Sequence, residues 1–492
     1  MRNLSASALA LTLVLGASGA TADDTGSVLS YHASPDRSGL FVVPGLTAAR
    51  AQGVRLDNAF QARLNGHLYA QPLFWRSDGG SPMLIAATES NEVAALDAAT
   101  GRQLWSRSLG VPVARGALGC GNINPLGITG TPVIDPASQA VYLDAAVAGQ
   151  AARHLVFALS LKDGTVLPGW PLDVAQALKE HGQSFNARDQ NERGALTILN
   201  GRLYVPFGGH FGDCGDYHGW VVGISLANPR AVAAWKTPAR GGGIWAPGGI
   251  ASDGQSLYVA TGNTFGAKSW MGGEAIIRLA GDLKGSNDRR DFFAPENWRA
   301  LDARDADLGG SNPVLLAPGA GAAARVLALG KDGHAYLLDR ANLGGIGGSL
   351  VNQTVARQAI RTAPAAYAIG DAAFVAFAGA GAHCPGGRSG NLTVLKIAAA
   401  SEPSLRTAWC AAAGGAGSPI VTTTEGRADP IVWIVGAEGD NRLHAFKGET
   451  GEALLPGTGA GPMAGLRHFQ TLIAAGGRLY VGADERIYAF SF

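Results

Sequence analysis

The stretch V-A-A-L-D-A-A-T-G-R-Q-L-W, from Val93 to Trp105, decides the fold of this chain. Val93–Leu96 is an apolar run typical of a strand, and a second run begins at Gln103 and ends on the large ring of Trp105. Between the runs, Asp can bond its own backbone and Gly tolerates a positive φ, so residues 97–101 predict a turn. A strand, a turn and a strand closed by tryptophan cannot bury their apolar face alone. The unit therefore predicts further copies along the chain.

Such copies are present. They read A-L-S-L-K-D-G at 158–164, A-F-K-G-E-T-G at 445–451 and, more loosely, G-K-D-G-H-A-Y-L-L-D-R at 330–340. A second signature precedes each unit, a short apolar strand followed by a turn and another strand, and it starts at Gln71, Thr131, Ala195, Ala246, Asn312, Ala363, Ser418 and Gln470. The spacing of roughly 50 to 66 residues is typical of propeller blades with variable loops. We predict an all-β fold, a single eight-bladed β-propeller of four-stranded blades.

The ring needs a closing strand. The last repeat, residues 467–492, has room for about three strands, and an open ring would leave a bare strand edge. We therefore expect an N-terminal strand to complete the last blade, and the segment 23–50, which contains the apolar run Leu40–Pro44, to supply it.

Composition and the N-terminus indicate an exported protein. Apolar residues make up 47% of the chain and charged residues 16%, which suits a large β core, and the net charge of +1 argues against nucleic acid as a partner. Arg2, the apolar run Ala8–Gly16 and the small residues Ala20-Thr21-Ala22 resemble a secretory signal; the alternative, a membrane anchor, is disfavoured because the run is too short. We expect a signal peptide at 1–22, the propeller at 23–492, no transmembrane segment, and a periplasmic or extracellular location.

Four cysteines in an exported chain predict disulfides, although free buried thiols are the alternative. Of the three possible connectivities we favour Cys120 with Cys214 and Cys384 with Cys410, because each pair joins neighbouring parts of the ring. The chain contains no C-x-x-C pair, so a zinc ribbon, a redox dithiol and a c-type haem domain are not expected.

Three features in the middle of the chain could carry chemistry. Trp245 follows three glycines, which would let a flat ligand approach its ring; alternatively, it is a core tryptophan. Asn263 follows a strand and could ligate a hard cation such as calcium, or it is an ordinary turn residue. The segment 302–312 is rich in aspartate and could hold a metal or supply a base, or it is a solvated loop.

With these residues in view, the chain resembles the pyrroloquinoline-quinone (PQQ) dehydrogenases and their non-catalytic propeller relatives, and the repeat resemblance covers nearly all of residues 23–492. The resemblance implies PQQ and Ca²⁺ bound on the axis of an eight-bladed ring. Residues 241–245 with 261–263 look like the segment of the floor tryptophan, Trp245, and of the metal ligand, Asn263. Residues 305–312 are similar to the segment of the catalytic aspartate, Asp307, and residues 330–340 to that of the quinone-contacting cation, Lys331.

The chain departs from the family pattern at three places. A single cysteine, Cys120, stands where many members have two adjacent ones, and the arginine expected near residues 124–127 for the cofactor's carboxylates is absent. The metal glutamate expected before Gly219 is replaced by a run in which Asp213 or Asp216 would have to substitute.

Two functions follow as hypotheses. The first is a PQQ- and calcium-dependent oxidoreductase that acts on a small molecule, an alcohol or a sugar, with Asp307 as base and as a metal ligand beside Asn263 and Asp213. The second is a catalytically silent propeller that binds a protein partner or serves as an assembly scaffold. The fold alone does not choose between them.

Overall fold

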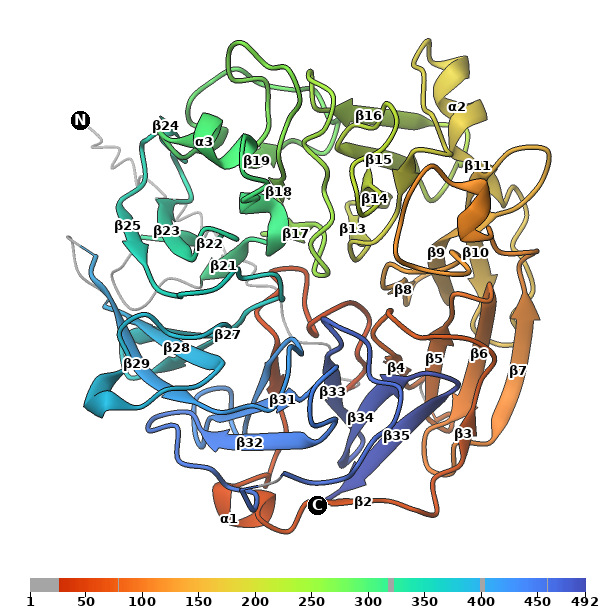
Figure 1. Ribbon diagram of the computed structural model, residues 1–492. Coiled ribbons are helices and arrows are strands. Elements are labelled where there is room, and N and C mark those ends of the chain that lie inside the picture. The colour runs from red at the N-terminus through yellow and green to blue at the C-terminus, as the bar shows by residue number, and fades with distance from the viewer. Residues whose placement is uncertain (1–25, 78, 317–322, 399–402, 458) are drawn as a thin grey trace, which may run out of the picture.

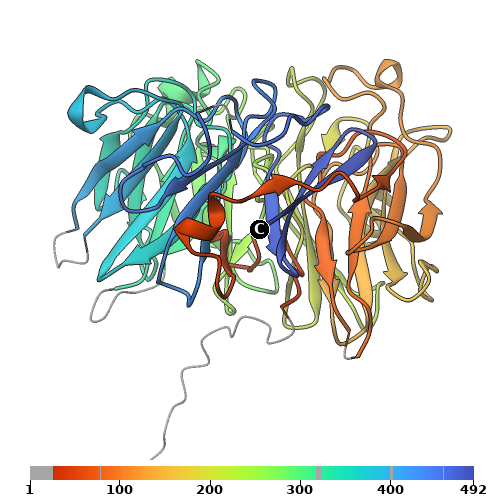
Figure 2. The same cartoon turned by 90° about the horizontal axis from the view of Figure 1, so that it is seen from below.

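The computed structural model describes residues 26–77, 79–316, 323–398, 403–457 and 459–492, so the expected signal peptide at 1–22 lies outside the described residues. Eight mainly antiparallel sheets surround a central axis, which confirms the predicted eight-bladed propeller (Figure 1). Seen edge on, the blades form a squat ring with loops at both faces (Figure 2).

The first six blades take all four of their ring strands from one continuous stretch of chain. Blade 1 contains β4 (Leu73–Trp75), β5 (Met83–Ala87), β6 (Glu92–Asp97) and β7 (Gln103–Ser108). Blade 2 contains β8 (Val133–Asp135), β9 (Ala140–Val147), β10 (Arg153–Ser160) and β11 (Leu172–Asp173). Blade 3 contains β13 (Thr197–Leu199), β14 (Arg202–Gly209), β15 (Trp220–Ser225) and β16 (Val232–Lys236). Blade 4 contains β17 (Ala251–Ser252), β18 (Leu257–Thr261), β19 (Ala275–Leu279) and β20 (Phe292–Ala294). Blade 5 contains β21 (Val314–Leu316), β22 (Arg325–Leu329), β23 (His334–Asp339) and β25 (Val351–Thr354). Blade 6 contains β26 (Ala365–Ile369), β27 (Ala372–Ala378), β28 (Leu392–Ile397) and β29 (Leu405–Ala411).

Blades 7 and 8 combine C-terminal strands with N-terminal ones. Blade 7 contains β30 (Ile420–Thr423), β31 (Ile431–Val435), β32 (Leu443–Lys447) and β1 (Leu40–Val42), whereas blade 8 contains β33 (Leu472–Ala475), β34 (Arg478–Ala483), β35 (Arg486–Ser491), β2 (Arg55–Leu56) and β3 (Ala62–Arg63). The remaining elements are short: β12 (Gln190–Asn191), β24 (Gly345–Ile346), α1 (Ala48–Ala51), α2 (Val174–Glu180), α3 (Trp298–Asp302) and the 3₁₀ turns η1 (Arg115–Ala117), η2 (Leu308–Gly310) and η3 (Pro385–Gly387).

The repeat unit works as its sequence predicts. The Asp97 carboxylate accepts hydrogen bonds from the amides of Ala99 and Thr100, at 3.1 and 2.8 Å, and so closes the turn. Gly101 has φ +78°, and a Cβ there would lie 2.5 Å from the amide nitrogen of Ala62 in the neighbouring blade. At the other end of the unit, the Trp105 indole donates to the Leu161 carbonyl of the next blade, at 3.0 Å. This turn and this tryptophan therefore link blade 1 to its two neighbours.

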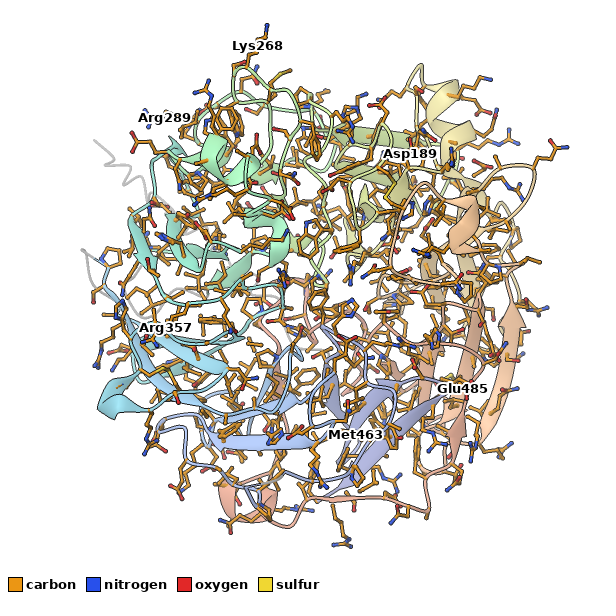
Figure 3. All side chains as sticks on the ribbon, viewed as in Figure 1. Asp189, Lys268, Arg289, Arg357, Met463 and Glu485 are labelled. Atoms are coloured by element: carbon orange, nitrogen blue, oxygen red, sulfur yellow. A yellow bond between two sulfur atoms is a disulfide. The ribbon has the colours of Figure 1, made fainter. Side chains whose placement is uncertain are left out.

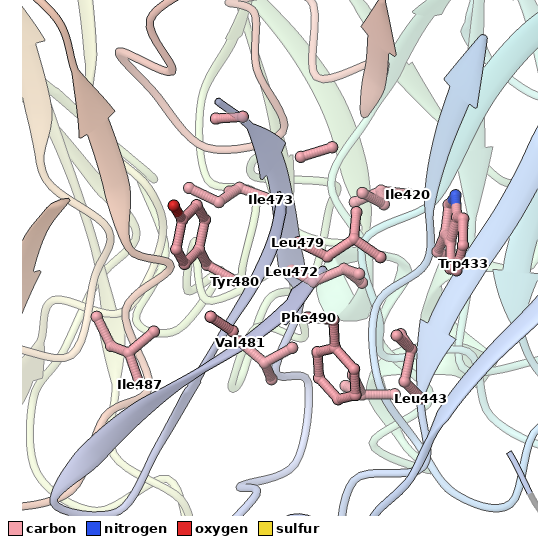
Figure 4. Close-up of a cluster of buried hydrophobic side chains, with 14 of the residues drawn as sticks. Ile420, Trp433, Leu443, Leu472, Ile473, Leu479, Tyr480, Val481, Ile487 and Phe490 are labelled. Carbon is pink, nitrogen blue, oxygen red and sulfur yellow. The ribbon is translucent and has the colours of Figure 1, made fainter. Parts of the chain in front are cut away.

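The core lies between the blades. Figure 4 shows one such interface, where blade 7 packs against blade 8 through buried side chains that include Ile420, Trp433, Leu472 and Phe490. Charged side chains such as Lys268 and Arg289 project from the outer rim (Figure 3). The apolar period of the strands is thus used to stack one sheet on the next around the ring.

An N-terminal strand does close the last blade, but it comes from a different segment than expected. Arg55 and Leu56 of β2 pair antiparallel with Ser491 and Phe490 of β35. The more apolar run at residues 40–42 instead forms β1, which pairs in parallel with the inner strand β30 of blade 7. The expectation that segment 23–50 completes the last blade is therefore wrong in its choice of segment. A two-residue strand suffices there because it covers the edge of an already paired sheet.

Residues 28–39, called here the N-terminal plug, cross the middle of the ring and contact the innermost part of every blade (Figure 1). His32 and Arg37 within it are fully buried. The contacts, in blade order, are Val28 with Phe74, Leu29 with Ile134, Arg37 with Leu196, Pro35 with Ser252, Asp36 with Leu315, Ser38 with Ala366, Gly39 with Val421 and His32 with Thr471.

The structure contains both predicted disulfides. Cys120 and Cys214, 94 residues apart in the chain, join the loop after blade 1 to a loop of blade 3, and Cys384–Cys410 lies within blade 6. Among the described residues, no helix is long and apolar enough to cross a membrane.

Candidate functional site

Four residues singled out in the sequence meet near the axis, although they come from separate loops of blades 4 and 5. Asp307 accepts a hydrogen bond from the backbone amide of Asn263 at 2.8 Å. Its other carboxylate oxygen lies 2.6 Å from Lys331 Nζ, and that ammonium lies 5.3 Å from the centre of the Trp245 ring. The structure therefore brings Trp245, Asn263, Asp307 and Lys331 into one cluster.

Two glycines make this close approach possible. A Cβ on Gly262 would lie 3.0 Å from Asp307 Oδ1 and 3.3 Å from Trp245 Nε1. A Cβ on Gly310 would lie 3.2 Å from Lys331 Cγ and 3.4 Å from Trp245 Cη2. All four distances are at or below the tight end of van der Waals contact, so the local Thr-Gly-Asn and Gly-Gly-Ser sequences let the indole, the carboxylate and the ammonium lie against the backbone.

The electrostatics of the cluster suit proton transfer. The Asp307 side chain is only 4% exposed, and burial raises its pKa above the ordinary aspartate value, while Lys331 opposes the rise. Burial lowers the pKa of Lys331, but the carboxylates of Asp307 and Asp305 outweigh it and raise that pKa overall. A carboxylate with a raised pKa is better matched to accept a proton near neutral pH.

Glu274 is a member of this cluster that the sequence reasoning missed. It is fully buried, and one carboxylate oxygen accepts a hydrogen bond from the Leu308 amide at 2.6 Å. Its other oxygen has no hydrogen-bond partner among the described residues. Burial first, and then the neighbouring Asp307 carboxylate, hold the pKa of Glu274 well above its usual range. The available signal was an acidic residue directly before the apolar strand β19, where a buried carboxyl is unusual.

The third residue predicted as a metal ligand has another partner. Asp213 accepts a hydrogen bond from the Tyr217 hydroxyl at 2.6 Å, whereas Asn263 and Asp307 lie together in the cluster. Within the described ranges, no group of three or more His, Cys, Asp or Glu residues is placed to hold a metal ion. Cys120, which stands where the family has its cysteine pair, is bonded to Cys214.

Comparison with known proteins shows the fold. No protein-family model and no curated protein matches the chain. Among solved structures, the quinohemoprotein alcohol dehydrogenase from Comamonas testosteroni matches with a TM-score of 0.66 at 15% identity, over 96% of this chain and 81% of that one. A europium-containing methanol dehydrogenase matches with a TM-score of 0.65 at 12% identity, over 96% and 99%.

A looser likeness is to BamB from Moraxella catarrhalis, with a TM-score of 0.46 at 14% identity over 89% and 95% of the two chains, and it supports no functional argument. The first two matches span the whole propeller, but identities this low establish architecture rather than activity. The chain has the eight-bladed propeller fold of the quinoprotein alcohol and methanol dehydrogenases.

Proposed function

We propose that this protein is a PQQ-dependent oxidoreductase that oxidises an alcohol or a sugar near the axis of its ring. The observation that carries the proposal is the cluster of Trp245, Asn263, Asp307 and Lys331, in which a buried base, a fixed cation and an aromatic face lie together. The fold shared with quinoprotein dehydrogenases supports it.

The residues present fit a quinone better than they fit a metal. Trp245 is only partly buried, so a planar ring can rest against it, and Lys331 beside it can stabilise negative charge on a reduced oxygen. For Ca²⁺, the chain offers the oxygens of Asn263 and Asp307, which are ligands of the hard type that calcium prefers. Asp213 would join them only by giving up its hydrogen bond from Tyr217.

In the proposed reaction, Asp307 removes the proton from the substrate hydroxyl, and the hydrogen bond that the Asn263 backbone N–H donates to it holds the carboxylate in place. Lys331 fixes the second carboxylate oxygen and balances its charge. Bound PQQ would supply the acceptor for the hydride that leaves the substrate carbon. The two disulfides are consistent with our further proposal that the protein is exported to an oxidising compartment, the periplasm or the cell exterior.

Binding of PQQ in the presence of Ca²⁺ tests the proposal. Purified protein should show a bound-quinone absorbance spectrum, and Trp245→Ala should weaken binding because a stacking surface is lost. Trp105→Ala is the matched control, since that indole lies at the contact between blades 1 and 2. If the wild-type protein binds no PQQ at micromolar concentration, the enzyme proposal is wrong and a binding or scaffold role is the remaining hypothesis.

A second test separates binding from chemistry. Asp307→Asn keeps the size of the side chain and its acceptor for the Asn263 amide but removes the base. Dye-linked turnover should fall by about 10²–10⁴-fold while PQQ still binds. In the wild-type protein, activity should also fall as the pH drops through the raised pKa of Asp307, because the protonated carboxyl cannot accept the hydroxyl proton.

A further inference from the structure

A row of two aromatic rings with a cation at each end extends the cluster beyond Trp245. The Trp245 and Phe469 rings have their centres 6.5 Å apart and are tilted by 42°. Lys331 lies 5.3 Å from the Trp245 ring centre at one end, and the Arg193 guanidinium carbon lies 4.9 Å from the Phe469 ring centre at the other. The four side chains come from loops of blades 3, 4, 5 and 8, so the row forms around the axis and is invisible in any one repeat.

Arg193 carries a positive charge that the protein does not neutralise by contact. Its guanidinium donates to His468 Nε2 at 2.9 Å, and His468 Nδ1 lies 2.8 Å from a Glu438 oxygen, so Nδ1 bears the ring proton. Burial and the neighbouring Arg193 lower the pKa of His468, which leaves this ring neutral. Among the described residues, Arg193 forms no ion pair with a carboxylate, and only one of its five N–H donors is used by a side chain.

Phe469 is held in place at a conformational cost. Its φ is +67°, a region that a bulky side chain rarely adopts. Its amide donates to the Ala416 carbonyl at 3.1 Å, and its carbonyl accepts from the Ser418 hydroxyl at 2.9 Å. These bonds fix the Phe469 ring between Trp245 and Arg193, which is an arrangement typical of a binding site.

A small cavity lies beside the row, on the side of Arg193 and Phe469. It has a volume of about 20 Å³ and is also lined by Tyr69, Thr129 and Thr131. A space of this size holds one water molecule or one of the two oxygens of a carboxylate, whose other oxygen then stays on the side of the ring axis. The carboxylates of Glu89 and Glu438 act on Arg193 only through space. The open donors of Arg193 are therefore available to an acid group that enters from the ring axis.

We propose that Arg193 and Phe469 bind the carboxylate end of a planar aromatic acid whose ring lies against Trp245. The inference rests on the proposed function, because the acid it concerns is the quinone cofactor. Arg193, from blade 3, thus takes the part of the arginine that is missing near residues 124–127. The guanidinium pairs with a carboxylate through two parallel hydrogen bonds, and the Phe469 ring supports both groups.

The test compares PQQ with its trimethyl ester, which keeps the ring but has no charged carboxylates. Affinities are measured by quenching of tryptophan fluorescence for the wild type, Arg193→Met, Arg193→Lys and the exposed control Arg357→Met, after circular dichroism has shown that each variant is folded. Arg193→Met should weaken PQQ roughly 10- to 100-fold, which is the loss expected for a charged hydrogen bond. The affinity of Arg193→Lys for PQQ should lie between those of the wild type and Arg193→Met, because lysine keeps the charge without the planar pair of donors. Binding of the ester should not respond to either variant.

The outcomes separate this inference from the proposed function. If the wild type binds PQQ and Arg193→Met binds it equally well, the role of Arg193 is refuted while the oxidoreductase proposal stands. Benzene-1,3,5-tricarboxylate serves as a second planar acid. If that acid binds in an Arg193-dependent manner and PQQ does not bind, the acid site stands and the oxidoreductase proposal fails. If neither acid binds, both are wrong.

Discussion

Replacing Arg37 by lysine tests how the N-terminal plug is held. Arg37 is fully buried, and its two terminal nitrogens donate separately to the carbonyls of Tyr31, at 3.0 Å, and Leu196, at 2.8 Å. Burial lowers the pKa of Arg37 to about 10, so the group is charged at neutral pH. Lysine keeps the charge but ends in a single nitrogen, which cannot span the positions of both arginine nitrogens.

At least one buried carbonyl should then be left without a partner, which costs about 1–3 kcal/mol. With a urea dependence of about 3 kcal/mol/M, the unfolding midpoint should fall by about 0.3–1 M. The assay is equilibrium unfolding in urea at neutral pH, followed by circular dichroism. Arg50→Lys is the matched control, because Arg50 also donates to a carbonyl, that of Phe492, but is exposed. An unchanged midpoint for Arg37→Lys, or an equal fall for the control, would refute the reasoning.

Three further perturbations follow from the buried groups and the turns. Burial raises the pKa of Glu89 from 4.5 to about 7, so its contribution to stability is complete below pH 4.5 and is lost as the pH rises through 7. Between pH 4.5 and 8 the unfolding free energy of the wild type should therefore fall by up to about 3 kcal/mol more than that of Glu89→Gln. Urea unfolding across this pH range measures both, and identical pH profiles would contradict the prediction. Gly101→Ala should be more destabilising than Gly79→Ala, since φ is similar (+78° and +69°) but only Gly101 abuts a neighbouring backbone; equal melting temperatures would argue against the contact. Replacing Cys120 and Cys214 together by serine should lower the unfolding free energy by about 2–4 kcal/mol. If a reductant lowers the unfolding free energy of the wild type and of the variant by the same amount, this disulfide is not the source of the stability.

The sequence predicts those parts of the fold that depend on interactions between residues close together in the chain. The Asp97–Gly101 turn depends on a side chain that bonds its own backbone and on a glycine with positive φ, and both requirements are readable within five residues. Repetition of that unit then predicts the ring. The disulfide partners followed from the order of the blades, since cysteines in adjacent parts of a ring are close whatever their separation in the chain.

The unpredicted parts depend on contacts between distant residues. The N-terminal plug has no apolar period, because it contacts each of the eight blades through only one or two hydrogen bonds. The closing strand Arg55–Leu56 is too short to show any alternation. In the candidate site, Trp245 and Asn263 stood out from their local sequence, and Asp307 and Lys331 were identified through the family resemblance. Arg193 was missed because its partner His468 lies 275 residues away.

The pairing of Leu56 with Phe490 also has a kinetic consequence. The plug and the closing strand leave the ribosome first, but their partners in blades 7 and 8 are synthesised last. Contacts of such long sequence separation form late and slow the overall rate of folding. During synthesis the N-terminal segment must wait without its final partners, and incomplete rings with exposed sheet faces are the species most prone to aggregate. Refolding should therefore be limited by the pairing of β35 with β2, which joins the two ends of the chain.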